Sequence, residues 1–377
     1  MTEPLQWSNY NEDDPYPLIE SDPLGVLSST RKVVEQGEHV WINKERVELL
    51  AAQFMASNTR EAVHSKSASE ADEDRELQDR SRTSGQNQDV PDITLPALTW
   101  YDRYHFHDGT ERTVNWLLVL DALNFCFWAD IGSPRWRIEY QNERLDGYWA
   151  EAASLTRAVE EGIPLWDAEY LSSISSDTLA YIFRGEERIP LFEQRLKNVQ
   201  EVGRVLLERF DGQFVRAVEQ AQGSAVKLAL LLVDNFSSFC DVASYRSHTV
   251  RFFKRAQICV ADLYGSFHGK SWGAFYDLGK LTAFADYKLP QILRHFEVLE
   301  YEPTLAKRID NQELLEQGGE EEVELRAATV WACELLRREM AQQGHSITTA
   351  EIDSRLWLLS QNLTGMRPYH RTRTIYY

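Results

Sequence analysis

The sequence is poor in cysteine and has no visible export signal. Its 377 residues include four cysteines, which are far apart and form no CxxC pair: Cys126, Cys240, Cys259 and Cys333. Three of them lie in apolar runs, which is typical of buried thiols in a reducing compartment, and the ligand spacing of a zinc site is missing. The first residues, MTEPLQWSNYNEDDPYP, are acidic and lack the apolar core of a secretory signal. We expect a cytoplasmic or nuclear protein without a metal site.

Positive charge is also scarce. The chain carries 40 Lys and Arg against 59 Asp and Glu, a formal net charge of −19. Such a chain repels phosphate polymers and anionic membranes, although a local basic pocket can still bind a small phosphorylated ligand. The longest apolar run, residues 114–128, is too short to cross a membrane and contains Asn115, Asp121 and Asn124. We therefore expect a soluble protein with a small-molecule substrate, no direct contact to nucleic acid or membrane, and no obligate protein partner.

Helical patterns dominate, and the signatures of the common nucleotide-binding folds are absent. There is no GxGxxG, no GxxxxGK[ST], no repeated βαβ pattern and no repeat of fixed period. RWRIEYQNERLDGYW alternates and then turns, which predicts one β-hairpin, and HVWIN followed by ERVELLAAQFM predicts a short strand before a helix. Further helices are expected at 114–129, which is apolar on nearly every face, and at 148–161, 191–210, 225–236, 252–267 and 320–343.

The composition divides the chain into one folded domain and two loose segments. Residues 1–25 are rich in Pro, Asp and Asn, which predicts a flexible acidic arm. Residues 58–92 contain almost no apolar residues and cannot bury enough surface to offset the entropy of ordering, which predicts a disordered insertion. We expect a single, mainly α-helical domain over residues 26–377, interrupted by this insertion.

Two apolar stretches contain charged residues that need a partner or a role. FFKRAQICVADLYGSF opens with Lys254 and Arg255; Lys254 faces a cleft, or both cations extend to the surface. LTAFADYKLPQIL places Asp286 between aromatic residues and shortly before Pro290. Its carboxylate either points into a pocket at a helix end or caps the helix that follows.

Two further stretches combine polar and aromatic residues. WYDRYHFHDG contains His105 among aromatics, where a hydrogen-bonded packing role is more common than metal binding because no HExxH spacing is present. Near the C-terminus, Asp353 precedes an apolar Leu-Trp pair, and Arg371 and Arg373 belong to the densest basic patch of the chain. These arginines either bind a phosphate or dock the tail by pairing with carboxylates.

At these same places the sequence resembles the queuosine salvage protein family, the queuosine 5′-phosphate N-glycosylases. The resemblance covers roughly residues 93–377, more weakly 29–56, and leaves out 1–25 and 58–92. It is carried in order by VNWLLVLDALNFCFW, GYWAEAASLTRAVEEGIPL, FKRAQICVADLY, LTAFADYKLPQIL, EVELRAATVWACELL and HRTRTIYY. It implies a mainly α-helical fold similar to helix-hairpin-helix DNA glycosylases. It also implies release of queuine from queuosine 5′-phosphate, which makes the base available for wobble modification of tRNA.

The resemblance also implies roles for individual residues. Asp286 matches the catalytic carboxylate, and Lys254 matches its basic partner. Phe284 and Ala285 would help line the slot for the base, with Tyr287 beside them. His105 and Asp353 match positions that contact the base. Apart from the resemblance, Lys254 could bind the 5′-phosphate or hold Asp286 ionised, and Arg371 and Arg373 are secondary candidates for the phosphate.

Two positions depart from the family pattern. Ser354 and Leu358 stand where the family often has an aromatic and an acidic residue, so contacts to the amino-linked cyclopentenediol of the base are expected to differ. The same departures would suit a non-catalytic module that binds a queuosine-like nucleotide. A DNA-glycosylase-like repair enzyme is the other alternative, which the charge of −19 opposes.

The expected chemistry needs no metal and no organic cofactor. Cleavage of an N-glycosidic bond builds positive charge on the ribose. The carboxylate of Asp286 can stabilise this charge, attack the sugar, or orient water as a base. A 7-deaza base has carbon in place of N7, so the departing base must be stabilised elsewhere. A carboxylate at Asp353 can accept two bonds from the guanine-like edge, and His105 can contact the carbonyl or the side arm.

Overall fold

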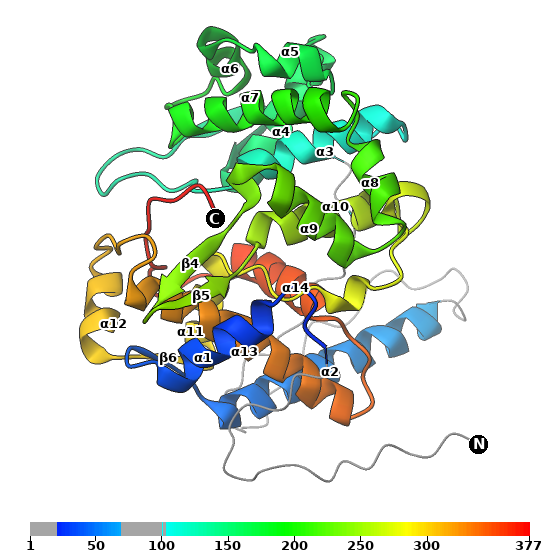
Figure 1. The fold of residues 1–377 in the computed structure, drawn as a ribbon. Coiled ribbons are helices and arrows are strands. Elements are labelled where there is room, and N and C mark those ends of the chain that lie inside the picture. Colours follow the sequence, from blue (N-terminus) through cyan, green and yellow to red (C-terminus); the bar gives the residue numbers. More distant parts are fainter. Residues whose placement is uncertain (1–20, 69–99, 101–102) are drawn as a thin grey trace, which may run out of the picture.

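The computed structural model describes residues 21–68, 100 and 103–377 (Figure 1). Within these residues the fold is mainly helical, as predicted. The helices are α1 (Val26–Gln36), α2 (Lys44–Ala68), α3 (Glu111–Leu123), α4 (Gly147–Glu160), α5 (Ala168–Ser172), α6 (Ser176–Ile182), α7 (Phe192–Arg209), α8 (Val215–Ala221), α9 (Ala225–Asn235), α10 (Lys254–Ser266), α11 (Lys288–His295), α12 (Pro303–Asp310), α13 (Glu320–Gln342) and α14 (Thr349–Asn362). The strands are β1 (Val40–Ile42), β2 (Arg137–Tyr140), β3 (Glu143–Asp146), β4 (Val242–Tyr245), β5 (His248–Arg251) and β6 (Leu299–Tyr301).

The helices form two parts that are joined by α13. In Figure 1, α3 to α10 occupy the upper part, and α1, α2 and α11 to α14 the lower part. A first hydrophobic cluster surrounds α3, which is buried on every side from Thr113 to Leu123. A second cluster joins α2, α11, α13 and α14. Helix α13 contributes Trp331 to the first cluster and Leu325 to the second, so its opposite faces bind the two parts together.

Short antiparallel pairs complete the fold. The predicted hairpin is present as β2–β3, with Arg137 opposite Asp146 and a turn in which Gln141 and Asn142 have positive φ. The strand predicted at HVWIN is β1, but its partner is the distant β6, with Val40 opposite Tyr301. The hairpin β4–β5 was not predicted. One small hairpin was therefore too few: the described chain contains three two-stranded sheets.

Several helices and helix boundaries differ from the predictions, and α5, α6, α8, α12 and α14 were not predicted. Helix α1 was not predicted at all, and Asp22, predicted to lie in the arm, caps it by accepting the N–H of Val26 at 3.1 Å. Helix α2 continues to Ala68, past residue 58, while residues 69–92 of the predicted insertion lie outside the described residues. Helix α3 ends at Leu123 instead of 129.

The early end of α3 has a physical cause. The carbonyls that a longer helix would use are taken by buried cations: Arg195 donates to the carbonyls of Leu123 and Phe125, and Lys254 donates to that of Asn124 at 3.2 Å. The chain then runs irregularly to Trp128. This irregular segment forms part of the candidate site described below.

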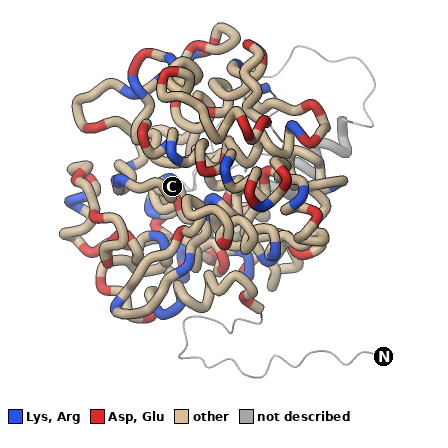
Figure 2. Tube along the Cα trace, turned by 45° about the horizontal axis from the view of Figure 1, so that its top comes forward, with Lys and Arg blue, Asp and Glu red and all other residues tan. Residues whose placement is uncertain are grey.

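Charged residues of both signs are distributed over the fold. Figure 2 shows acidic and basic residues interspersed along the chain in the face that is drawn. Of the helices in the described part of the chain, none is both long enough and apolar enough to cross a bilayer.

Candidate active site

A cavity of about 670 Å³ lies where the two parts of the fold meet. Its upper walls come from the segment after α3, the end of the β2–β3 hairpin with the start of α4, and one face of α10. Its lower walls come from the segment before α11, from α14 and from the C-terminal tail. The volume is typical of a small-ligand pocket between structural units.

Helix α10 places Lys254 in this cavity. Lys254, Ile258 and Asp262 are spaced by four residues and therefore share the face of α10 that lines the cavity. Lys254 is only 4% exposed, and the neighbouring Arg255 is 1% exposed and donates to the carbonyls of Asp121 and Ala122. The alternative in which both cations extend to the surface is therefore wrong.

Asp286 both caps a helix and faces the cavity. Its Oδ1 accepts the N–H groups of Lys288 and Leu289, each at 2.8 Å, at the start of α11. Among the described residues no hydrogen bond engages Oδ2, which leaves this oxygen for a ligand. Burial raises the pKa of Asp286 and the charge of Lys254 lowers it, so these two groups interact inside the cavity.

Asp353 and His105 lie in the same cavity. Asp353 is 4% exposed, and its Oδ2 accepts the N–H of Phe284 at 2.6 Å. Burial, followed by the nearby charge of Asp286, raises the pKa of Asp353 well above its usual value. His105 bonds the hydroxyl of Tyr148 through Nε2 at 2.8 Å and packs on Trp100, so it is a packing histidine that also lines the cavity.

The other residues predicted at the base slot divide into two groups. Phe284, Tyr287, Ser354 and Leu358 line the cavity, and the Ser354 hydroxyl turns back to the carbonyl of its own helix. Ala285 is buried outside the cavity wall, and its carbonyl accepts a hydrogen bond from Arg326. Its contribution to the slot is therefore at most indirect.

Arg371 and Arg373 do not line the cavity. Arg371 donates to the carbonyl of Ala129 and to the side chain of Gln312, and Arg373 pairs with Asp130 at 2.5 Å. Both arginines thus dock the tail, which was the alternative reading of the basic patch. The phosphate role predicted for them has no support in this geometry.

Two other cations line the cavity instead, and sequence reasoning missed them. Lys288 is the first residue of α11, two positions after Asp286, and that proximity was the available signal. Arg135 precedes the β2–β3 hairpin and is paired only loosely with Asp146, at 3.5 Å. Nothing in the local sequence around Arg135 points to a ligand, because the fold alone brings the hairpin to the cavity.

Buried acids outnumber buried bases around Lys254. The buried acids are Asp121, Glu151, Asp286 and Asp353, with the half-buried Asp262 beside them, and the buried bases are Lys254, Arg195 and Arg255. Burial raises the pKa of Asp262 to about 7 and that of Glu151 to about 8. Burial thus disfavours the ionised form of these carboxyls, which a local pattern in the sequence could not reveal.

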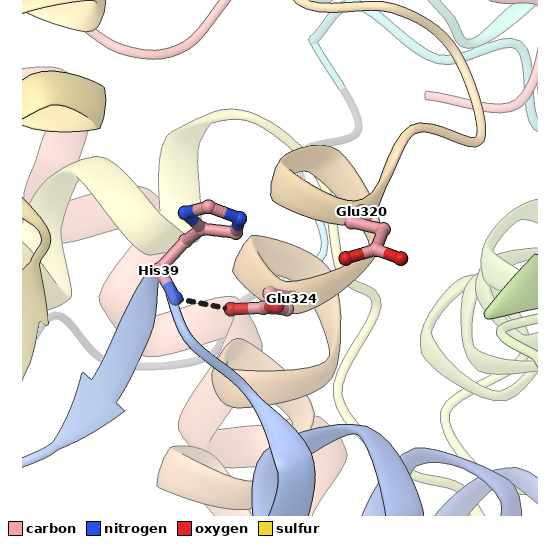
Figure 3. Close-up of side chains that lie close together, drawn as sticks. All are labelled: His39, Glu320 and Glu324. Carbon is pink, nitrogen blue, oxygen red and sulfur yellow. Dashed lines mark hydrogen bonds between the residues drawn. The ribbon is translucent and has the colours of Figure 1, made fainter. Parts of the chain in front are cut away.

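One group elsewhere has the composition of a metal site but not its chemistry. His39, Glu320 and Glu324 place possible ligand atoms within 4.8 Å of one another, as Figure 3 shows. However, Oε2 of Glu324 already accepts three backbone N–H groups, including that of His39, and Oε1 accepts the hydroxyl of Tyr245 at 2.8 Å. These bonds make Glu324 an anchor for the turn before β1, and the group does not fit a cation.

Comparison with known proteins identifies the family of this chain. A family model described as queuosine salvage protein matches residues 104–377. A protein of Sphaerobacter thermophilus named queuosine 5′-phosphate N-glycosylase/hydrolase is 47% identical over 357 residues, which are 94% of this chain and 98% of that protein. Proteins of the same name from Mus musculus and Schizosaccharomyces pombe are 37% and 31% identical, over 71% and 75% of this chain and 82% and 88% of their own. The chain therefore belongs to the queuosine salvage protein family.

Proposed function

We propose that this protein hydrolyses queuosine 5′-phosphate to queuine and ribose 5-phosphate, and so recovers queuine for wobble modification of tRNA. The observation that carries the proposal is that Asp286 and Lys254 are both buried in the wall of one cavity of about 670 Å³, where no hydrogen bond from a described residue engages Oδ2 of Asp286. The relatives are named for the same reaction. The roles of individual residues below are part of the proposal.

Asp286 acts on the sugar. As the bond between C1′ and the base nitrogen breaks, its electron pair leaves with the base and positive charge develops on the ribose. The ionised carboxylate of Asp286 stabilises this charge or attacks C1′. Lys254 favours the ionised form that either role requires. Water then supplies the hydroxyl that ends on C1′ and the proton that ends on the base.

Asp353 recognises the base, and it does so as a neutral carboxyl group. The raised pKa of Asp353 differs from the expectation of a carboxylate that accepts two bonds. A neutral carboxyl accepts the N1–H of a guanine-like edge with one oxygen and donates to the neighbouring carbonyl with the other. Donation to that carbonyl also takes up negative charge from the departing base, which has no N7 to protonate. Phe284 and Tyr287 provide aromatic surface for the base.

The 5′-phosphate is bound by Arg135 and Lys288. We expect Arg135→Gln and Lys288→Gln each to raise KM for queuosine 5′-phosphate about tenfold, because each removes a charged hydrogen bond to phosphate. The KM for the nucleoside queuosine, which lacks the phosphate, should stay near its wild-type value. Steady-state kinetics with both substrates measure this, and Arg188→Gln, an exposed arginine outside the cavity wall, is the control. An equal loss with nucleotide and nucleoside would show that these cations do not read the phosphate.

A direct assay separates the main proposal from its alternatives. Incubation with queuosine 5′-phosphate should release free queuine, detected by chromatography. A non-catalytic module would retain the nucleotide intact. A repair enzyme would release a base from duplex DNA and would retard the DNA on a low-salt gel. That outcome would mean that the proposed similarity to helix-hairpin-helix DNA glycosylases extends from fold to function.

We further propose that the domain works in the cytoplasm or nucleus without a cofactor.

A further inference from the structure

Arg326 lies behind the cavity and connects the two sides of the candidate catalytic pair. It is on α13, is 2% exposed and is not part of the cavity wall. Its Nη1 and Nη2 donate to Oδ1 and Oδ2 of Asp241 at 3.0 and 2.5 Å. Its Nε donates in another direction, to the carbonyl of Ala285 at 3.1 Å. One guanidinium thus holds two separate segments.

The two segments are those that carry Lys254 and Asp286. Asp241 also accepts the backbone N–H of Lys254 through Oδ2 at 3.2 Å, at the point where α10 begins. The residue before it, Phe253, has a φ of 51°, a conformation that a bulky residue adopts only where its surroundings hold it. On the other side, Ala285 is joined to Asp286 by a single peptide bond. Arg326 is therefore connected to the backbone of Lys254 through the carboxylate of Asp241, and to Asp286 through the carbonyl of the preceding residue, Ala285.

We infer that Arg326 is a positioning residue for the hydrolysis, which fixes the spacing between Lys254 and Asp286 without touching the substrate. This inference rests on the proposed function. The role suits arginine because its planar guanidinium donates along fixed directions, whereas a lysine ammonium is a single flexible point of charge. The ring centroids of Phe252 and Tyr377 lie 3.9 and 4.4 Å from Cζ of Arg326. These ring contacts hold the plane of the guanidinium in place.

The test replaces the guanidinium but keeps the charge. In Arg326→Lys the pairing with Asp241 can persist while the bond to the Ala285 carbonyl is lost. We expect kcat for queuosine 5′-phosphate to fall about 10- to 100-fold, as for the loss of exact placement at a reacting group. KM should stay within about twofold, since Arg326 does not line the cavity. The acidic limb of the pH profile of kcat should move to higher pH, because Asp286 then feels Lys254 less.

The control is Arg294→Lys, which alters another arginine paired through both nitrogens with an aspartate. Arg294 bonds Asp310 at 2.7 and 3.2 Å, and neither residue lines the cavity. If both variants lower the melting temperature alike and neither changes kcat or the pH limb, Arg326 is only structural and the inference is overturned. Asp241→Asn weakens the contact between Asp241 and Arg326 from the other side and should reproduce the loss in kcat. This variant replaces Arg326→Lys as the test if Arg326→Lys does not fold. A wild-type chain that releases no queuine would instead overturn the proposed function, and the inference with it.

Discussion

Replacing Asp286 by asparagine should lower kcat by about 10³-fold or more while the protein stays folded. The substitution removes the negative charge that faces the developing cation, and loss of such a group costs rates of this order. The helix cap should survive, because the amide oxygen of asparagine can still accept the N–H groups of Lys288 and Leu289. Single-turnover kinetics with queuosine 5′-phosphate measure the loss, and thermal unfolding checks the fold.

A second capping carboxylate provides the control for this result. Asp167 accepts the N–H of Tyr170 at 2.9 Å at the start of α5, away from the cavity wall. Asp167→Asn should leave kcat unchanged. Queuine should bind to Asp286→Asn with nearly wild-type affinity, since Asp286 is assigned to the sugar and not to the base. Near-normal turnover by Asp286→Asn would remove this residue from the mechanism.

Lys254→Met should lower kcat about 10²-fold and change its pH dependence. Methionine is unbranched like lysine and only one atom shorter, but it carries no charge, so the change removes the cation beside Asp286. Burial raises the pKa of Asp286 and Lys254 lowers it, so without Lys254 the pKa of Asp286 rises. In the proposed mechanism Asp286 acts in its ionised form, and activity on the acidic side should therefore be lost at a higher pH than in the wild type.

The pH profile of kcat measures this shift. Other charged groups around Asp286 also affect the position of the acidic limb. Lys288 also lowers the pKa of Asp286, so Lys288→Gln should move the acidic limb in the same direction. Asp353, on α14, interacts electrostatically with Asp286, so it also affects the pH at which the acidic limb falls. Lys227→Met, a change at a lysine of α9 outside the cavity wall, should leave the profile in place. A lower melting temperature with an unmoved limb would make Lys254 structural.

The local sequence was enough for the helices that end on local signals. Helix α4 was predicted to stop before Gly162, and the glycine has the left-handed φ of 86° that ends a helix cheaply. The end of α3 could not be predicted, because it depends on Arg195 and Lys254, which lie far along the chain. The pairing of β1 with β6 likewise joins segments that are distant in the sequence.

The candidate site shows the same division. Lys254 and Asp286 stood out because charged residues in apolar stretches are costly unless they have a partner. The density of positive charge in the tail predicted that its arginines bind phosphate, but neither of them lines the cavity. The arginines there are neutralised by contacts such as Arg373 to Asp130, whereas Arg135 reaches the cavity only through the fold. Local charge density does not tell which cations remain available to a ligand.

The docked tail has a consequence for when the cavity can form during protein synthesis. Tyr377 lines the cavity, its carbonyl accepts the N–H of Cys126 at 3.0 Å, and its hydroxyl donates to Glu322 at 2.7 Å. A nascent chain can therefore carry Lys254 and Asp286 clear of the ribosome and still lack one wall of the cavity. Catalytic competence should arise only after translation of the tail, as a late step of maturation.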